Sequence, residues 1–164
     1  MNTPLRLVPI TRKLFDPVAC LEVHEHQRDF LASNAYSIAE ASFNDALRPR
    51  ALMAGDEPVG FVMYVVPEAG DEEPGSYGIW RFMIDRTHQG KGYGRAALEL
   101  VLREIGQDAG ASKVFISYKP DNGIAKRLYA AFGFKESGLE ADTGEMVAVL
   151  ALNGPGPRLW DLAA

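Results

Sequence analysis

The sequence has a single cysteine, Cys20, no long hydrophobic run and no excess of positive charge. One cysteine cannot form an internal disulfide, which is typical of a reducing cytoplasm. The longest apolar stretches, such as 146–152, are far shorter than the about 20 residues that a membrane-spanning helix needs. The first six residues lack the pattern of a signal peptide. The net charge of −5 disfavours nucleic-acid binding, which relies on a basic face. We therefore expect a cytoplasmic protein with no membrane and no nucleic-acid partner.

The length of 164 residues suits one domain, and no internal repeat or low-complexity segment divides it. Residues 1–152 carry the regular hydrophobic patterns, so they form the predicted domain. The glycines and prolines that begin at Asn153 break regular structure, so residues 153–164 are predicted to be a tail. Trp160 in this tail is a candidate for docking on the domain or on a partner chain.

Hydrophobic periodicity and capping signals predict the order βααβββαβαββ. The predicted strands are 5–10, 50–54, 59–66, 77–85, 113–118, 134–137 and 145–152. The predicted helices are 17–29 after Asp16-Pro17, one that Ser37 opens and that stops before Arg48-Pro49, 92–105, and one from Asn122 to Gly133. A strand–helix–strand unit at the centre predicts a parallel pair, and the hairpin before it predicts antiparallel pairing. The expected fold class is α/β (α+β mixed), with helices on both faces of a mixed sheet.

The turn between the strand 77–85 and the next helix is rich in glycine. Gly90, Gly92 and Gly94 alternate there, and Lys91 and Arg95 add positive charge. Glycine allows backbone N–H groups to approach a ligand closely, and a helix N-terminus attracts anions. This pattern is typical of a pyrophosphate cradle.

Spacing excludes two familiar phosphate-binding loops at this turn. A P-loop needs four residues between its glycines and then Lys-Ser/Thr, which is absent. The dinucleotide fingerprint fails because Arg95 stands where its third glycine would be. From the residues alone, two interpretations stay open: an anion site, or a tight turn with a glycine-assisted helix start.

Two motifs resemble those of one family. Residues 89–94 match the Q/R-x-x-G-x-G/A motif of the GNAT (GCN-related) N-acetyltransferase superfamily, and residues 122–134 resemble its N-x-x-A-x-x-L-Y-x-x-x-G-F signature. The resemblance implies a mostly antiparallel sheet with a parallel central pair, acetyl-CoA as co-substrate, no metal, and a homodimer. Within the superfamily the chain looks most like bacterial spermine/spermidine (diamine) acetyltransferases.

The resemblance also assigns cofactor contacts. It implies that the strand backbone pairs with the pantetheine arm, that the turn holds the pyrophosphate, and that Asn122 contacts pantetheine. For Asn122 alone, a plain helix cap is an equally good interpretation. The implied cofactor-binding residues are Phe82, Met83, Ile84, Gln89, Gly90, Lys91, Gly92, Tyr93, Gly94, Arg95 and Asn122.

Tyr129 is the predicted catalytic residue. Attack of an amine on a thioester expels a thiolate, and a phenol with a pKa of about 10 can share a proton with a thiol of pKa about 8.5. Tyr129 is offset from the apolar positions Ile124, Leu128 and Phe132, so the pattern does not require its burial with them. The alternative interpretation is an aromatic core residue.

The acceptor side is less defined. Trp80 and Arg81 stand where some polyamine-acetylating relatives carry an acidic residue, so one proposed base is missing. The other candidates for a base are side chains of the predicted first helix, with an ordered water relay as the alternative: Glu22, His24, Glu25 and His26. A metal site there is disfavoured, because residues two apart on a helix do not share a face. The predicted substrate-binding residues are Glu22, Glu25, His26 and Trp80.

The leading hypothesis is an acetyl-CoA-dependent N-acetyltransferase that acetylates a primary amine of a small molecule, with polyamines first. The resemblance implies direct attack in a ternary complex. Two alternatives stay open: a non-catalytic CoA-binding module on the same fold, and an acetyltransferase for peptide or protein amines.

Overall fold

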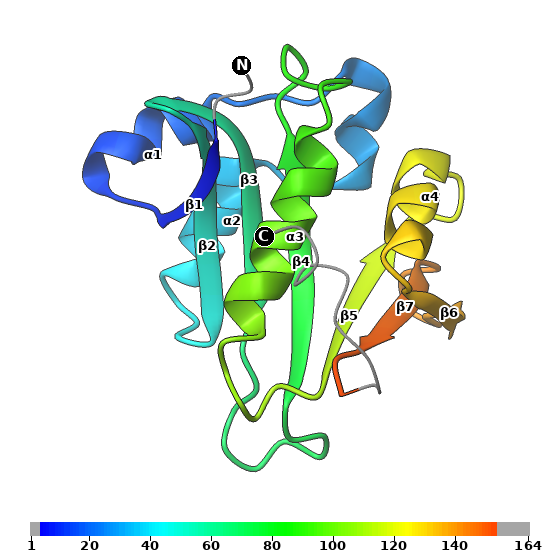
Figure 1. Cartoon of the computed structure of the whole chain (residues 1–164). Helices are drawn as coiled ribbons and strands as arrows, with labels where there is room; N and C mark the ends of the chain where they lie inside the picture. Colours follow the sequence, from blue (N-terminus) through cyan, green and yellow to red (C-terminus); the bar gives the residue numbers. More distant parts are fainter. Residues whose placement is uncertain (1–3, 154–164) are drawn as a thin grey trace.

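The computed structural model describes residues 4–153, which form one seven-stranded sheet with helices on both faces (Figure 1). Four α-helices and one 3-10 helix accompany the strands within these residues. In chain order the elements are β1 (Leu5–Pro9), α1 (Arg12–Ala19), η1 (Glu25–Phe30), α2 (Asn34–Ala41), β2 (Leu47–Ala54), β3 (Glu57–Val65), β4 (Ser76–Ile84), α3 (Tyr93–Ile105), β5 (Lys113–Tyr118), α4 (Gly123–Ala131), β6 (Lys135–Leu139) and β7 (Met146–Ala151). This order confirms the predicted one, except that a 3-10 helix takes part of the place of the first long helix.

The strand order across the sheet is β1-β2-β3-β4-β5-β7-β6. Every neighbouring pair is antiparallel except β4 and β5, which are parallel. The α3 crossover between those two strands explains this, because parallel neighbours need a long connection. The predicted mixed sheet with a parallel central pair is confirmed.

Side chains of β3 alternate between the two faces of the sheet. Phe61 and Met63 pack in one hydrophobic cluster with Val18 of α1. Val62 and Tyr64 point the other way, into a cluster that α3 and α4 complete. Since both faces of this strand are buried, β3 is apolar over most of its length.

The first predicted helix is wrong in its bounds. Thr11 is the N-cap of α1, and Pro17 lies inside the helix rather than at its first position. Proline has no backbone N–H, so the Lys13 carbonyl lacks its partner within the helix, and α1 ends at Ala19, two residues after Pro17. The chain then leaves helical geometry until η1 begins at Glu25, so the predicted helix 17–29 does not exist.

The second helix begins earlier than predicted. Ser33 is its N-cap and accepts a hydrogen bond from the Tyr36 backbone N–H at 3.1 Å. Ser37, which we expected to be the cap, is buried inside the helix and donates its hydroxyl to the Ser33 carbonyl. A second capping signal one turn upstream therefore decides where α2 starts.

The strand β2 begins at Leu47, three residues before the predicted start at Arg50. Pro49 lies opposite Met63 of β3, but the pairing of β2 with β1 starts only at Arg50. Proline is tolerated in a strand where one side has no neighbour, and that is its position here.

The later elements agree closely with the predictions. The strand β5 has the predicted bounds, and α3 begins one residue after the expected start. Asn122 caps α4 by accepting the Ala125 backbone N–H, and Gly133 follows that helix with a φ of +91°, as a glycine after a helix C-terminus often does.

Two further predictions concern a membrane-spanning helix and Trp160. Among residues 4–153, no helix is long and apolar enough to cross a membrane. Trp160, for which docking on the domain or a partner chain was expected, lies outside the described residues.

Candidate functional site

The sheet opens along one edge of β4. Parallel pairing between β4 and β5 covers only Ser76 to Ile79, opposite Lys113 to Ile116. Beyond Ile79, β4 keeps its neighbour β3 but has no partner on the β5 side, and the two strands diverge toward the C-terminal end of β4 (Figure 1). Unpaired strand edges offer backbone N–H and C=O groups to an extended ligand.

A bulge in β4 accompanies the opening. Met63 of β3 faces Arg81, and the next β3 residue, Tyr64, faces Ile79, so Trp80 is an extra residue in β4. Such a bulge changes the side-chain alternation along the strand. The predicted site residues Phe82, Met83 and Ile84 follow directly after it.

The glycine-rich turn ends at the N-terminus of α3. Gly90 and Gly92 have φ values of +76° and +80°, in the left-handed region that favours glycine. A Cβ atom built at either residue would meet no heavy atom within 4 Å, so the space above the turn is open. Gly92 is the N-cap and makes no side-chain hydrogen bond to α3, whose first backbone N–H groups lack partners within the helix. The turn and the helix start together are suited to an anion.

A cleft of about 410 Å³ joins the open edge of β4, the glycine turn and α4. Eleven of the twelve residues predicted for catalysis and cofactor binding line this main cleft; Lys91, which is exposed, does not. The residues of the main cleft are Val23, Gln27, Phe30, Leu31, Phe82, Met83, Ile84, Gln89, Gly90, Gly92, Tyr93, Gly94, Arg95, Asn122, Ile124, Ala125, Leu128 and Tyr129.

Tyr129 lies in the wall of the main cleft and is only 6% exposed, so it is buried although the sequence pattern did not require this. The helix α4 turns Ala125, Tyr129 and Phe132 toward the sheet, and Ile124 is exposed instead. The rings of Tyr118, Phe82 and Phe134 surround the Tyr129 ring, and the centroid of Tyr118 lies 5.5 Å from that of Tyr129.

The phenol of Tyr129 is electrostatically unusual. Burial raises its pKa well above the usual tyrosine value, and the neighbouring Tyr118 adds to the effect. The hydroxyl has no hydrogen-bond partner among the described residues. The phenol is therefore protonated at neutral pH and has its O–H free to donate to a ligand in the main cleft.

Two further cavities continue from Tyr129 along η1. A narrow pocket of about 60 Å³ shares Phe82, Asn122, Ala125 and Tyr129 with the main cleft. An outer pocket of about 280 Å³ follows the narrow pocket, and the two share Trp80, Arg81, Ser117 and Lys119. Phe30 and Leu31 line all three cavities. Trp80, predicted for substrate binding, thus lies between the two smaller pockets.

Sequence reasoning missed the residues of η1 that face the cavities. Gln27 and Gln89 exchange side-chain hydrogen bonds of 3.2 and 2.8 Å, so η1 is attached to the glycine turn. Gln89 also donates to the Ile84 carbonyl at 3.0 Å. Because Gln27 is polar and η1 is a short 3-10 helix, no apolar stripe in the sequence marked the side of this segment that faces the cavities.

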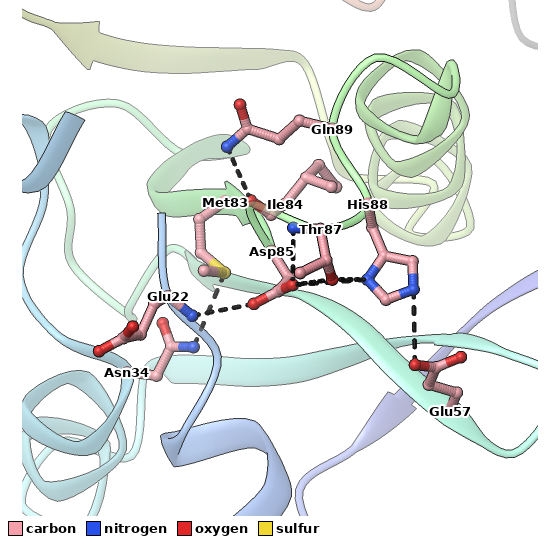
Figure 2. Close-up of polar contacts among 9 residues, drawn as sticks. All are labelled: Glu22, Asn34, Glu57, Met83, Ile84, Asp85, Thr87, His88 and Gln89. Atoms are coloured by element: carbon pink, nitrogen blue, oxygen red, sulfur yellow. Dashed lines mark hydrogen bonds and ion pairs between the residues drawn. The ribbon is translucent and has the colours of Figure 1, made fainter. Parts of the chain in front are cut away.

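Asp85 connects three segments beneath the turn (Figure 2). Its buried carboxylate accepts the Glu22 backbone N–H at 3.0 Å and both the N–H and the hydroxyl of Thr87. Burial acts to raise the pKa of Asp85, but these hydrogen bonds and that of His88 outweigh burial and hold the pKa below the usual value. No motif pointed to this residue in the sequence.

His88 extends this network toward β3. Its Nδ1 lies 3.5 Å from Asp85 and 3.0 Å from the Thr87 hydroxyl, and its Nε2 lies 3.5 Å from Glu57 (Figure 2). The ring stacks on Tyr93 of the main cleft. The glycine turn is therefore supported from below by the Glu57 side chain of β3 and by the Glu22 backbone N–H before η1.

The predicted acidic and histidine candidates lie away from Tyr129. Glu22 precedes η1 and forms ion pairs with Arg28 and Arg86 at 3.7 and 3.3 Å. Glu25, His26 and His24 are exposed, and the two histidines stack on each other. These four side chains line neither the main cleft nor the narrow and outer pockets. Among the described residues, no cluster of His, Cys, Asp or Glu is arranged to hold a metal.

This arrangement, a strand opened beside an anion-binding helix start, is typical of enzymes that bind an extended phosphorylated cofactor. A model of the acetyltransferase (GNAT) family matches residues 16–134. The chain therefore belongs to the GNAT acetyltransferase family and is an N-acetyltransferase.

Two characterised relatives are similar in sequence. The chain is 30% identical over 134 residues to the spermine/spermidine N(1)-acetyltransferase of Bacillus subtilis (strain 168). The matched region covers 80% of this chain and 88% of that protein. It is 28% identical over 106 residues to the L-2,4-diaminobutyric acid acetyltransferase of Streptomyces anulatus, over 64% of this chain and 50% of that protein.

Solved structures show the same fold. Spermidine N-acetyltransferase from Vibrio cholerae, in complex with CoA and spermine, has a TM-score of 0.71 at 17% identity, over 92% of this chain and 96% of that one. Mycobacterium smegmatis RimJ, in complex with CoA-disulfide, has a TM-score of 0.76 at 15% identity, over 97% and 88% of the two chains.

Proposed function

We propose that this enzyme transfers the acetyl group of acetyl-CoA to a primary amine of a small molecule that carries more than one amino group. Acetyl-CoA, when bound, supplies the acetyl group as an activated thioester. The proposed catalytic domain is residues 1–152, the residues after it form a tail, and the proposed enzyme is a cytoplasmic homodimer, as its family resemblance implies.

The residues of the main cleft fit this co-substrate. Open space above Gly90 and Gly92, and the free N–H groups at the start of α3, suit a pyrophosphate. The unpartnered edge of β4 at Phe82 to Ile84 suits an amide-containing arm, to which a strand edge can donate and accept hydrogen bonds. Asn122 uses its Oδ1 to cap α4, which leaves its side-chain N–H groups for the same arm.

Tyr129 is the proposed proton donor. Attack by an amine on the thioester carbonyl breaks the C–S bond, so the departing sulfur gains negative charge. The phenol of Tyr129 remains protonated because its pKa is raised, and it can donate its O–H proton to that sulfur. A backbone N–H on the open edge of β4 is the proposed donor to the carbonyl oxygen during attack.

The acceptor amine is proposed to approach from the narrow pocket, on the far side of Tyr129 from the glycine turn. Among the residues that the structure describes, no carboxylate or histidine lines this pocket. We assign removal of the amine proton to water, and direct attack follows without an acyl-enzyme.

The substrate class rests on the relatives. The Bacillus relative is named for spermine and spermidine, and the Streptomyces relative for a diamino acid. A small molecule with at least two amino groups is common to both names, so this is the class that we propose.

The position of Tyr129 carries the proposal, because its free phenol lies where the main cleft meets the narrow pocket. The test supplies purified enzyme with acetyl-CoA and a panel of amines, and measures released CoA thiol and the mass of the product. We expect release with amines that carry a second amino group. Absence of release with every amine would contradict the proposed function and favour a module that binds CoA without catalysis.

A further inference from the structure

The charged side chains of the narrow and outer pockets differ in sign with their distance from Tyr129. This arrangement narrows the substrate class of the proposed function, and the inference rests on that proposed function. The narrow pocket has two charged residues, Arg81 and Lys119, and both are cations. The outer pocket contains the same two cations and adds Asp29 and Glu145. Positive charge therefore lies next to the reacting region, and negative charge lies farther out.

Arg81 has hydrogen-bonding capacity left over. Its Nη2 pairs with Glu40 of α2 at 3.3 Å, and its Nη1 donates to the adjacent Trp80 carbonyl. Its Nε is buried and has no hydrogen-bond partner among the described residues. A buried donor without a partner is costly, and because Arg81 lines both pockets, its positive charge favours an anionic group there.

The two carboxylates of the outer pocket, Glu145 and Asp29, differ in how closely they are paired with cations. Lys119 lies 3.8 Å from Glu145, a distance at the outer limit of an ion pair, and both side chains are partly exposed. Asp29, at the exposed end of η1, has no ion pair or hydrogen bond from its carboxylate to any described residue. Asp29 is therefore the carboxylate most available to an ammonium group of a ligand.

A long polyamine does not suit this arrangement. Spermine and spermidine carry only positive charges, so each would place an ammonium group beside the two cations that line the narrow pocket. A carboxylate at that point would instead be attracted by both cations.

We infer that the acceptor is a zwitterionic diamino acid. Arg81 and Lys119 bind its carboxylate, Asp29 and Glu145 bind its distal ammonium group, and the amine next to the carboxylate is the one presented to Tyr129. The cations also assist the reaction, since nearby positive charge disfavours the ammonium form and so favours the free amine that attacks. The proton lost by the amine passes to water.

The decisive comparison uses substrates that differ only by a carboxylate: L-ornithine against putrescine, and L-lysine against cadaverine. We expect kcat/KM to be higher for the diamino acid of each pair by at least roughly tenfold, the usual size of a charged hydrogen bond. NMR of the product should place the acetyl group on the amine next to the carboxylate. Acetylation of the distal amine would overturn the assigned orientation.

Variants separate the two ends of the pocket. In Arg81→Met and Lys119→Met, the ratio of kcat/KM between the members of each pair should fall toward one. In Asp29→Asn, kcat/KM should fall for both members of each pair to a similar degree, because both carry a distal ammonium group. Lys135→Met, at an exposed position of β6 outside the cavities, is the matched control and should leave every ratio unchanged.

Failure of this inference is distinguishable from failure of the proposed function. If diamines or polyamines are acetylated as well as or better than the diamino acids, the inference is wrong while the proposed function stands. If no amine is acetylated, the proposed function itself is wrong. The wild-type comparison needs no variant, so it decides the matter even if Arg81→Met, which leaves Glu40 without its partner, does not fold.

Discussion

The two halves of the site are built differently. The half around the glycine turn consists mainly of backbone groups: the helix start at Gly92 and the unpaired edge of β4. The half beyond Tyr129 consists of side chains from segments that are far apart in sequence: Asp29 and Phe30, Trp80 and Arg81, Ser117 and Lys119, and Glu145.

This difference explains what each half recognises. Backbone donors at a helix start suit a pyrophosphate whatever side chains surround them, so the first half is suited to a constant co-substrate. Side chains can be exchanged one at a time without changing the fold, so the second half is suited to a particular acceptor. Tyr129 lies between the halves and is the residue that we propose for the reaction that joins them.

The sharpest test of this division is Tyr129→Phe. We expect kcat to fall on the order of a hundredfold, because a proton donor to the leaving sulfur is lost, while acetyl-CoA binding is almost unchanged. Steady-state kinetics and calorimetric titration with acetyl-CoA measure the two effects. Tyr77→Phe, which removes a hydroxyl bonded to Asp108 outside the cavities, should retain kcat. Wild-type turnover in Tyr129→Phe would remove this residue from the mechanism.

Asp85→Asn weakens the support beneath the glycine turn. Loss of the charged acceptor for the Glu22 and Thr87 donors should lower the free energy of unfolding by about 2 kcal/mol at pH 7. Since the pKa of Asp85 is lowered in the folded state, its contribution is present above about pH 4 and is lost as the pH falls below that.

Urea unfolding of both proteins at pH 7 and near pH 3 measures this effect. The difference between wild type and Asp85→Asn should shrink at the lower pH. Asp56→Asn, in the exposed turn between β2 and β3, is the control. A difference that is the same at both pH values would mean that the charge of Asp85 is not what stabilises the turn.

Gly92→Ala tests the backbone half alone. A left-handed φ costs a residue with a side chain about 1 kcal/mol or more, and the new methyl group enters the open space above the turn. We expect the Kd for acetyl-CoA to rise roughly tenfold. Gly70→Ala also has a left-handed φ and open space, but it lies in a distant loop, so it should leave the Kd unchanged.

Gln27→Leu should have the smallest effect. It removes the paired hydrogen bonds to Gln89 and so loosens η1 from the glycine turn, at a cost of about 1 kcal/mol. KM should rise a few-fold for acetyl-CoA and for the acceptor together, because η1 borders both halves. Gln107→Leu, after α3 and outside the cavities, is the control. An increase for only one substrate would show that η1 serves one half alone.

The same contrast accounts for what could be predicted from the sequence. The glycine turn, α3 and the cap at Asn122 depend on residues close together in the chain, so local patterns identified them. The depth of Tyr129 was left open by the sequence, because the apolar Ile124 indicated a different helical face, and packing against Tyr118 of β5 and against Phe134 decides it. The predicted helix 17–29 failed because Asp16-Pro17, which predicts a helix start, lies inside α1, and the chain leaves helical geometry between Ala19 and η1.

The outer pocket could not be predicted, since its walls meet only after the sheet has formed. Asp29 and Glu145 are far apart in the chain, and no motif links them. The charge of Arg81 was visible, but its position next to Lys119 depends on the divergence of β4 from β5.

The extra residue in β4 has an evolutionary consequence. Because Trp80 shifts the alternation, Ile79 before it and Phe82 after it face the same side of the sheet, while Arg81 contacts α2 on the other. The bulge thus separates residues 80–81 from the regular part of β4 that we propose for the thioester. We therefore expect mutations confined to that dipeptide to change acceptor choice during divergence of gene copies, while the proposed acyl-donor site is preserved.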